Sequence, residues 1–470
     1  MSMGKRNEHQ ADLFVASSDL ETSGHPFYES LNTLLAEHDF DAFVEKTCES
    51  SYAPAGVGRP SVPPPIYFRM LFVGHFEGIS SEREIAWRCA DSLSLRRFLG
   101  LSLSDSVPSH STLSLIRDRL DPSVYDEVFR FVLSIAAAEG LVPAKRIGVD
   151  STKLESPASM RSIIRKDDGT SYSDYVKQLA ANAEPRPKKG DGGDSSARSY
   201  GGSASAEAAH RYDRHRRGKR TSNRDWTSAV DPDARITRMK NGTTRLGYKP
   251  EHAVDLDTSI VLAVSMNSGS SSDHASLPDT LGELDANLEH LALDLLDTEL
   301  VADKGYHSNA AFELAEDAGM RTYIAEPKQP RRNWRRSEAG YDNKRRFYAN
   351  RRRTKTKKGR ELLRLRGCEV ERSFAHLVHR RGPPRTGLRG LENNWKQYLT
   401  LTAAMNLGTV LRERIGAGTP KALAGLRLLV SLLMRVILAA RSRRQPVFKP
   451  RPTKTPAKSR RVRGALSRSE

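Results

Sequence analysis

The stretch from residue 299 to 327 constrains the fold more than any other, because its chemistry marks both the elements and their ends. It opens with a short apolar run, which predicts a strand ending at Asp303, and Gly305 then permits a turn with positive φ. A helical pattern follows, with Ser308 placed as N-cap and Gly319 just beyond the last turn. A second apolar run predicts another strand. Such a strand-helix-strand unit presents an acid at the carboxyl end of its first strand, where open α/β sheets usually carry their functional groups.

Three acids are candidates for a functional site, although each alone has a structural explanation. Asp303 by itself is as well explained as a turn cap. Asp150 ends a short alternating run that predicts a further strand, and small polar residues follow it. Glu371 lies at the border of the apolar face of a predicted helix at 361–377, where its side chain can enter a cleft. Their joint occurrence favours a functional interpretation.

Two other acids have a simpler explanation. Asp255 and Asp257 lie in and just after the first strand of a predicted antiparallel hairpin at 252–264, so we assign them no chemical role. An amphipathic helix is expected at 277–296 and another at 389–411.

Residues 26–140 predict a set of short helices separated by tight turns, after a flexible arm at 1–25. Ser81 and Glu84 have the spacing of a capping box at the start of one of these helices. Arginines recur along them, which is typical of a helical DNA-binding domain and equally of a structural domain with solvated arginines. Composition alone leaves both interpretations open.

The net charge of +19 indicates a polyanionic partner, either nucleic acid or an anionic membrane surface. A Gly- and Ser-rich, partly basic segment at 161–245 predicts a long, partly ordered insertion, which either touches phosphates or is a solvated linker. Residues 331–360 contain fourteen Lys and Arg residues and two acids, and aromatic residues are interspersed among them. This pattern favours a flexible strap that binds a nucleic-acid backbone. The tail from 441 onward is basic and is expected to be disordered.

Other classes of protein are disfavoured. The three cysteines are far apart in the sequence, which predicts neither a disulfide framework nor a zinc site. The apolar stretch at 422–440 contains Arg427 and Arg435, which indicates a buried or amphipathic helix rather than a membrane span. The first thirty residues show no signal-peptide core, so we expect a cytoplasmic protein.

At its three candidate acids the sequence resembles the DDE transposases of bacterial insertion sequences, in the superfamily named after insertion sequences four and five. The resemblance rests on V-D-S-T at 149–152, V-A-D-K-G-Y at 301–306 and V-E-R-S-F-A-H-L at 370–377. Segments with the family's pattern also occur in order at 58–71, 88–101, 389–399 and 403–408. Together these segments span most of the chain.

The resemblance implies an α/β fold in which an RNase H-like catalytic domain at 141–412 follows a helical N-terminal DNA-binding domain at 26–140. A helical, basic C-terminal extension is expected at 413–470. Asp150 and Asp303 are expected on neighbouring strands of the catalytic domain, with the basic insertion between them in the sequence.

The resemblance also implies that Asp150, Asp303 and Glu371 are both the catalytic residues and the metal ligands. Asp150 would bridge two Mg²⁺ ions, for which Mn²⁺ can substitute, while Asp303 holds one ion and Glu371 the other. Oxygen ligands suit these cations, and repulsion among the carboxylates makes the site dependent on them. The cationic residues expected to contact DNA are Lys304, Arg345, Arg346, Arg351, Arg352, Arg366 and Arg372.

The sequence departs from the family's pattern around the glutamate. Many relatives have Tyr and Arg before it and Lys after it, in slots that here hold Arg364, Gly367 and Val378. Arg366 or Arg372 would have to replace the missing arginine. Glu369 also competes with Glu371, which alone occupies the V-E-R-x-F frame.

The function implied is that of a transposase acting in the bacterial cytoplasm, at the nucleoid. It would bind the terminal inverted repeats of double-stranded DNA, cleave a strand to expose a 3′-OH and join it to target DNA. A homodimer is expected, because two ends must be brought together, and no membrane is involved. An RNase H-fold nuclease and a DNA-binding relic without activity are the alternatives.

Overall fold

The computed structural model describes most of the chain, and the elements discussed below lie in one compact unit within residues 1–420. The described residues are 24–54, 61–182, 206–216, 221–328, 334, 338–377 and 385–425. The predicted arm up to residue 23, the basic tail and the apolar stretch from 426 onward therefore lie outside the described residues. No helix within the described ranges is both long enough and apolar enough to cross a membrane.

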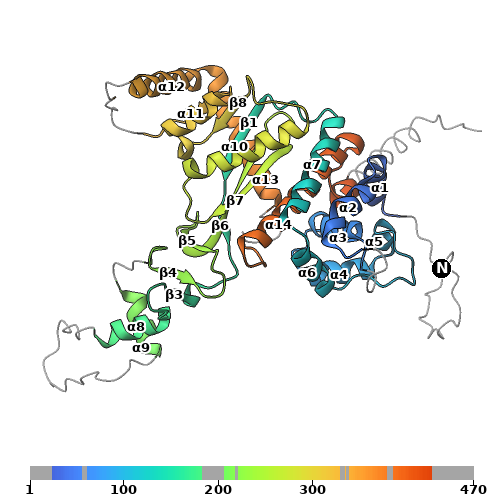
Figure 1. Cartoon of the computed structure of the whole chain (residues 1–470), viewed down its shortest axis with the longest axis horizontal. Helices are drawn as coiled ribbons and strands as arrows, with labels where there is room; N and C mark the ends of the chain where they lie inside the picture. Colours follow the sequence, from blue (N-terminus) through green and yellow to red (C-terminus); the bar gives the residue numbers. More distant parts are fainter. Residues whose placement is uncertain are drawn as a thin grey trace, which may run out of the picture. The chain divides into compact units, whose positions relative to one another are not determined.

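Short helices form the amino-terminal part of this unit, as the sequence predicts (Figure 1). They are α1 (Pro26–Glu37), α2 (Phe40–Cys48), α3 (Pro64–Glu77), α4 (Glu82–Asp91), α5 (Leu93–Phe98), α6 (His110–Arg119) and α7 (Pro122–Ala138). Gly78 ends α3 with a φ of 75°, a left-handed conformation that glycine tolerates. The predicted capping box is wrong, because Ser81 precedes α4 without a side-chain cap hydrogen bond.

A mixed sheet forms the centre of the α/β part. Its strands are β1 (Arg146–Ser151), β2 (Leu154–Glu155), β5 (Arg235–Arg238), β6 (Thr244–Asp255), β7 (Val261–Ser268), β8 (Glu299–Ala302) and β9 (Arg321–Ile324). The main path runs β2-β6-β1-β8-β9, and β5 and β7 also pair with β6. β1, β8 and β9 are parallel, whereas β6 is antiparallel to both β1 and β7. The predicted hairpin is confirmed, and Asp255 has the expected structural role, since it accepts a hydrogen bond from the Ala144 amide.

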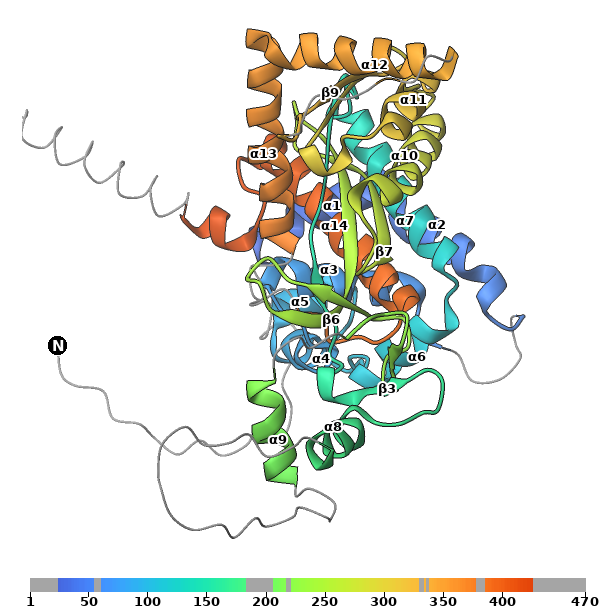
Figure 2. The same ribbon diagram turned by 90° about the vertical axis from the view of Figure 1, so that its left-hand side faces the viewer.

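Two helices cover opposite faces of β1. They are α10 (Asp273–His290) and α13 (Lys357–Leu377). Because side chains alternate along a strand, Gly148 and Asp150 share the face that α13 covers, whereas Ser151 lies on the other face. The Ser151 hydroxyl donates a hydrogen bond of 3.0 Å to Asp273 at the start of α10. Figure 2 shows the sheet between these two helices.

The strand-helix-strand unit predicted around Asp303 is confirmed. It consists of β8, a 3-10 turn η4 (Lys304–Tyr306), α11 (Asn309–Asp317) and β9. Ser308 caps α11 by accepting a hydrogen bond of 3.1 Å from an amide of the first turn, and Gly319 follows the helix with a φ of 71°. The prediction for Gly305 is wrong in its reason, because Gly305 is not among the residues with positive φ. A methyl group at Gly305 would instead overlap the Asp273 carboxylate.

The basic segment predicted to be a flexible strap is largely helical, so that prediction is wrong. Its described residues form α12 (Glu338–Lys355) and the first turn of α13. Figure 2 shows α12 lying across the end of α13 and beside α11 and β9. The amide of the buried Asn350 exchanges hydrogen bonds with the backbone of Ile324 in β9, which fixes the helix on the sheet.

The segment at 161–245 contains more regular structure than the sequence predicts. Its described elements before β5 and β6 are β3 (Ile163–Arg165), α8 (Tyr172–Ala181), α9 (Ala206–His215) and β4 (Trp226–Ser228). The buried ring of Trp226 packs edge-on against Tyr172 and Tyr175, with ring centroids 5.5 and 5.3 Å away. Aromatic contacts between distant residues thus replace the apolar periodicity that the sequence lacks.

A long helix, α14 (Leu391–Ile415), joins the helical part to the sheet. It packs against α3 and α7 on one side and against β7 on the other. The Asn406 side chain donates to and accepts from the backbone of Val261 in β7, at 2.8 and 3.0 Å. The amino-terminal helices and the sheet therefore belong to the same packed unit.

Candidate active site

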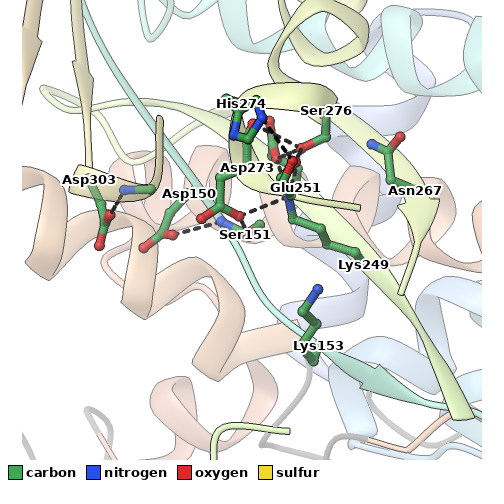
Figure 3. A network of polar contacts seen from close by, with 12 residues as sticks. Asp150, Ser151, Lys153, Lys249, Glu251, Asn267, Asp273, His274, Ser276 and Asp303 are labelled. Atoms are coloured by element: carbon green, nitrogen blue, oxygen red, sulfur yellow. Dashed lines mark hydrogen bonds and ion pairs between the residues drawn. The ribbon is translucent and has the colours of Figure 1, made fainter. Parts of the chain in front are cut away.

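Asp150 and Asp303 come together at one edge of the sheet (Figure 3). Val149 of β1 is paired with Ala302 of the parallel strand β8, so the next residue on each strand is one of the two aspartates. Burial raises the pKa of Asp150 above its usual value, and the charge of Asp303 raises it further. The Asp303 carboxylate caps η4 by accepting a hydrogen bond of 2.5 Å from the Gly305 amide. Both roles considered for Asp303, turn cap and member of an acidic pair, are therefore present.

Arg366 of α13 neutralises Asp150. Its guanidinium lies 2.6 Å from the Asp150 carboxylate, and both side chains are largely buried. This contact acts against burial and lowers the pKa of Asp150. Gly148 makes the approach of α13 possible, because a methyl group there would lie 3.0 Å from Val370 and 3.1 Å from Arg366. In the protein without a bound ligand, the Arg366 guanidinium therefore balances the charge of the Asp150 carboxylate.

The two candidate glutamates of α13, Glu369 and Glu371, lie on different sides of the helix. Glu369 is buried, accepts a hydrogen bond of 2.5 Å from Ser259 and pairs with Arg372. Ser259 belongs to the β6-β7 turn, which lies near the start of β1 because Ile147 is paired with the end of β6. Glu369 therefore points away from Asp150.

Glu371 lies three residues before Phe374 on α13. The ring of Phe374, one turn further along, stacks on His252 at 4.1 Å, and His252 is the strand partner of Asp150. Glu371 is exposed, and it makes no hydrogen bond or ion pair with any residue that the structure describes. Unlike the two aspartates, it is not part of an interacting acidic pair.

A polar network on the α10 face of the sheet was missed by the sequence analysis. The buried Lys249 ammonium lies 2.8 Å from Asp273 and 3.5 Å from the buried Glu251 (Figure 3). Ser276 accepts a hydrogen bond from Lys249 and donates one to Glu251. Although partial burial favours the neutral acid, Lys249 lowers the pKa of Asp273 below its usual value. Ser151, which follows Asp150 on β1, donates a hydrogen bond to Asp273 and so belongs to this network.

Comparison with protein families identifies the chain. Residues 16–119 match a transposase domain family designated DUF772, and residues 214–407 match the transposase DDE domain. The chain belongs to the DDE transposases of insertion sequences. No curated protein and no solved structure gave a significant match. Asp303 and Glu371 lie within the matched DDE range of this transposase, whereas Asp150 precedes it.

His252 supports the candidate site of the transposase by packing and contributes no charge to it. Burial lowers its pKa to about 3, so the imidazole is neutral. One ring nitrogen lies 2.8 Å from the Ser373 hydroxyl of α13, and the ring stacks on Phe374. These contacts hold α13 against the strand that pairs with β1.

The cationic residues predicted to contact DNA fall into two groups. Lys304 and Arg352 are exposed. The others form ion pairs within the protein: Arg345 with Glu316, Arg346 with Glu313 and Glu316, Arg351 with Glu326, Arg366 with Asp150 and Arg372 with Glu369. The ion pairs give the second group a structural role, and contact with DNA stays a prediction for all of them.

The donor set at the sheet edge suits a hard divalent cation in part. Asp150 and Asp303 offer carboxylate oxygens, which are ligands of Mg²⁺ and Mn²⁺. Across the described residues, no three His, Cys, Asp or Glu side chains gather closely enough to hold a metal ion. Asp273 approaches the same edge beside Gly305 but is engaged by Lys249. Two of the three expected ligands, Asp150 and Asp303, are thus adjacent, and Glu371 is not gathered with them.

Proposed function

We propose that this transposase cleaves and joins DNA strands at the ends of its element by metal-dependent phosphoryl transfer. The observation that carries the proposal is the adjacency of Asp150 and Asp303 at the ends of neighbouring parallel strands. The strand arrangement is consistent with an RNase H-like catalytic domain. In this chain α13 and Asp150 share one face of the sheet. Two charged carboxylates at one edge are costly unless a cation lies between them.

Asp150 and Asp303 would hold Mg²⁺ or Mn²⁺, with Glu371 as the third carboxylate. The bound cations would supply Lewis acidity and stabilise the attacking and leaving oxygens of an in-line displacement. Glu371 suits this role better than Glu369 does, because Glu369 is buried and engaged by Ser259 and Arg372. A rotation of α13 or of the Glu371 side chain is required to bring the third carboxylate in.

The surrounding residues orient the pair and the DNA. Arg366 holds Asp150 in the protein alone and must release it, after which its guanidinium is free to contact a phosphate near the cut. The exposed Lys304, next to Asp303, is placed to contact the DNA backbone. Lys249 and Ser151 fix Asp273 behind the pair. Because transposition brings two ends together, we propose that the active form is a homodimer on double-stranded DNA.

A second candidate is a transposase that binds DNA without cutting it. The exposed position of Glu371 and the ion pair between Arg366 and Asp150 favour this alternative. An RNase H-fold nuclease would cleave DNA but would give no joined product from pre-cleaved ends, so a strand-transfer assay separates it from a transposase.

The test uses DNA that carries the two ends flanking the coding sequence, with Mg²⁺ or Mn²⁺. Asp303→Asn should bind the ends like wild type and stop cleavage, because the amide keeps the turn cap but loses the charge. Asp297→Asn is the matched control, since Asp297 is an exposed acid beyond the opposite end of β8. Cleavage by Asp303→Asn at the wild-type rate removes Asp303 from the site. Wild-type protein that binds ends and never cuts supports the second candidate.

A further inference from the structure

One face of α12 is fixed to the rest of the protein. Phe347 and Asn350 are buried, and the Arg353 guanidinium donates to the backbone oxygen of Thr322 in β9 at 2.9 Å. Arg346 pairs with two acids of α11. α12 is therefore a rigid element whose remaining face has a defined position.

The opposite face of α12 carries a stripe of exposed cations and aromatic rings, of which Tyr348 also contacts Phe347 and Trp334. Its members are Tyr341, Lys344, Tyr348, Arg352 and Lys355, and we call it the α12 stripe. Successive members are three or four residues apart, so all five lie on one side of the helix. Tyr341 is 62 % exposed and Tyr348 39 % exposed. The three cations form no ion pair with any residue in the part of the chain that the structure describes.

The helix that carries the α12 stripe contacts the Asp303 loop of the candidate active site through its fixed face. Phe347, the neighbour of Tyr348, packs edge-on against His307, with ring centroids 5.5 Å apart. His307 ends the turn that begins with Asp303, so the stripe lies on a helix in contact with the Asp303 loop. The fifteen residues from Tyr341 to Lys355 span about 21 Å, which equals about six nucleotides at the stacked spacing of one strand.

The chemistry of the stripe selects a nucleic-acid strand with unpaired bases. Cations alone suffice for the phosphates of a duplex, whose bases are stacked on one another and covered. Exposed aromatic rings placed between cations add base stacking, which requires bases free of a duplex. Cleavage at an element end provides such bases where strands separate. Resting on the proposed function, we propose that the α12 stripe binds a single-stranded segment of DNA beside the cut.

The proposal differs from the earlier expectation for this segment. A flexible strap would use all its cations alike, whereas the helix divides them between two faces. Arg346 pairs with Glu313 and Glu316 of α11 and Arg353 donates to Thr322 of β9, while Lys344, Arg352 and Lys355 remain available.

The experiment measures DNA binding by the full-length protein in EDTA, where no cleavage occurs. Fluorescence anisotropy is recorded with a single-stranded oligonucleotide, with its duplex, and with a duplex that has a single-stranded flank. Tyr341→Ala/Tyr348→Ala should weaken binding to the single strand by roughly tenfold or more and leave duplex binding unchanged. A triple change to Gln of Lys344, Arg352 and Lys355 should weaken single-strand binding and reduce its salt slope by about 2. The control Arg321→Gln, at an exposed cation that pairs with Asp297 at the other end of the strands, should change neither.

The outcomes separate this proposal from the proposed function. Because the substituted side chains are exposed, thermal unfolding of each variant should match wild type, and binding is compared only between folded proteins. Unchanged single-strand affinity in the double tyrosine variant overturns the proposal. Equal loss for the duplex also overturns it and makes the stripe a duplex-backbone site. Wild-type protein that never cuts with Mg²⁺ or Mn²⁺ overturns the proposed function and leaves the binding result standing.

Discussion

Replacing Lys249 by methionine tests whether the buried network beside the aspartate pair is held by charge. Lys249 and Glu251 are fully buried, and the lysine ammonium serves both Glu251 and Asp273. Methionine has a similar length, so the change creates little empty space and mainly removes the positive charge. Removal of one partner from a buried ion pair costs about 3–5 kcal/mol. Glu251 keeps hydrogen bonds from Ser276 and Thr280, so we expect a loss near the lower limit, about 3 kcal/mol.

The assay is urea unfolding of wild type and Lys249→Met between pH 5 and 8, with the free energy of unfolding taken from midpoint and slope. Burial already raises the pKa of Glu251, and removal of Lys249 raises it further. An acid whose pKa is higher in the folded state contributes stability that is lost as the pH rises through that pKa. The deficit of the variant should therefore shrink as the pH falls. The double variant Lys249→Met/Glu251→Gln should recover much of the loss at neutral pH. A deficit below about 1 kcal/mol, or one independent of pH, refutes the reasoning.

Four further substitutions test other parts of the account. Glu371→Gln should abolish cleavage with unchanged stability. Glu369→Gln should lower the unfolding free energy by about 1–2 kcal/mol and leave some cleavage. The reverse pattern in paired cleavage and unfolding assays would exchange the roles of the two glutamates. Gly148→Ala should cost about 1–3 kcal/mol in urea unfolding and slow cleavage, because the new methyl group would overlap Leu256 and crowd Val370 and Arg366 of α13; a variant as stable as wild type contradicts the close approach. Burial raises the pKa of Asp126 to about 7, so wild type should lose stability from about pH 4 to pH 7 relative to Asp126→Asn, and parallel unfolding profiles would exclude this.

Elements whose ends are marked by local chemistry were predicted correctly from the sequence. Ser308 and Gly319 mark the ends of α11, and the apolar runs on either side become β8 and β9. The pairing of Asp150 and Asp303 followed from the family resemblance and is realised by the register of β1 and β8. These features depend on residues close together in the sequence or on a motif.

Features that arise from contacts between distant segments could not be predicted. α12 is attached to β9 by hydrogen bonds of the polar residues Asn350 and Arg353 and not by an apolar face. Its sequence therefore resembles that of a flexible basic strap. Lys249 and Asp273 meet only once β6 is paired and α10 is packed on the sheet. The one available signal was the acid at the start of a helix after three serines, at 270–273.

The central claim is that Asp150 and Asp303 ligate the same divalent cations during cleavage. The most direct test is the rate of cleavage of element ends by Asp303→Cys in Mg²⁺ and in Mn²⁺, because a thiolate is a poor ligand for Mg²⁺ and a better one for softer cations. The account predicts a large loss of rate in Mg²⁺ and partial recovery in Mn²⁺. Cleavage in Mg²⁺ at the wild-type rate would contradict it.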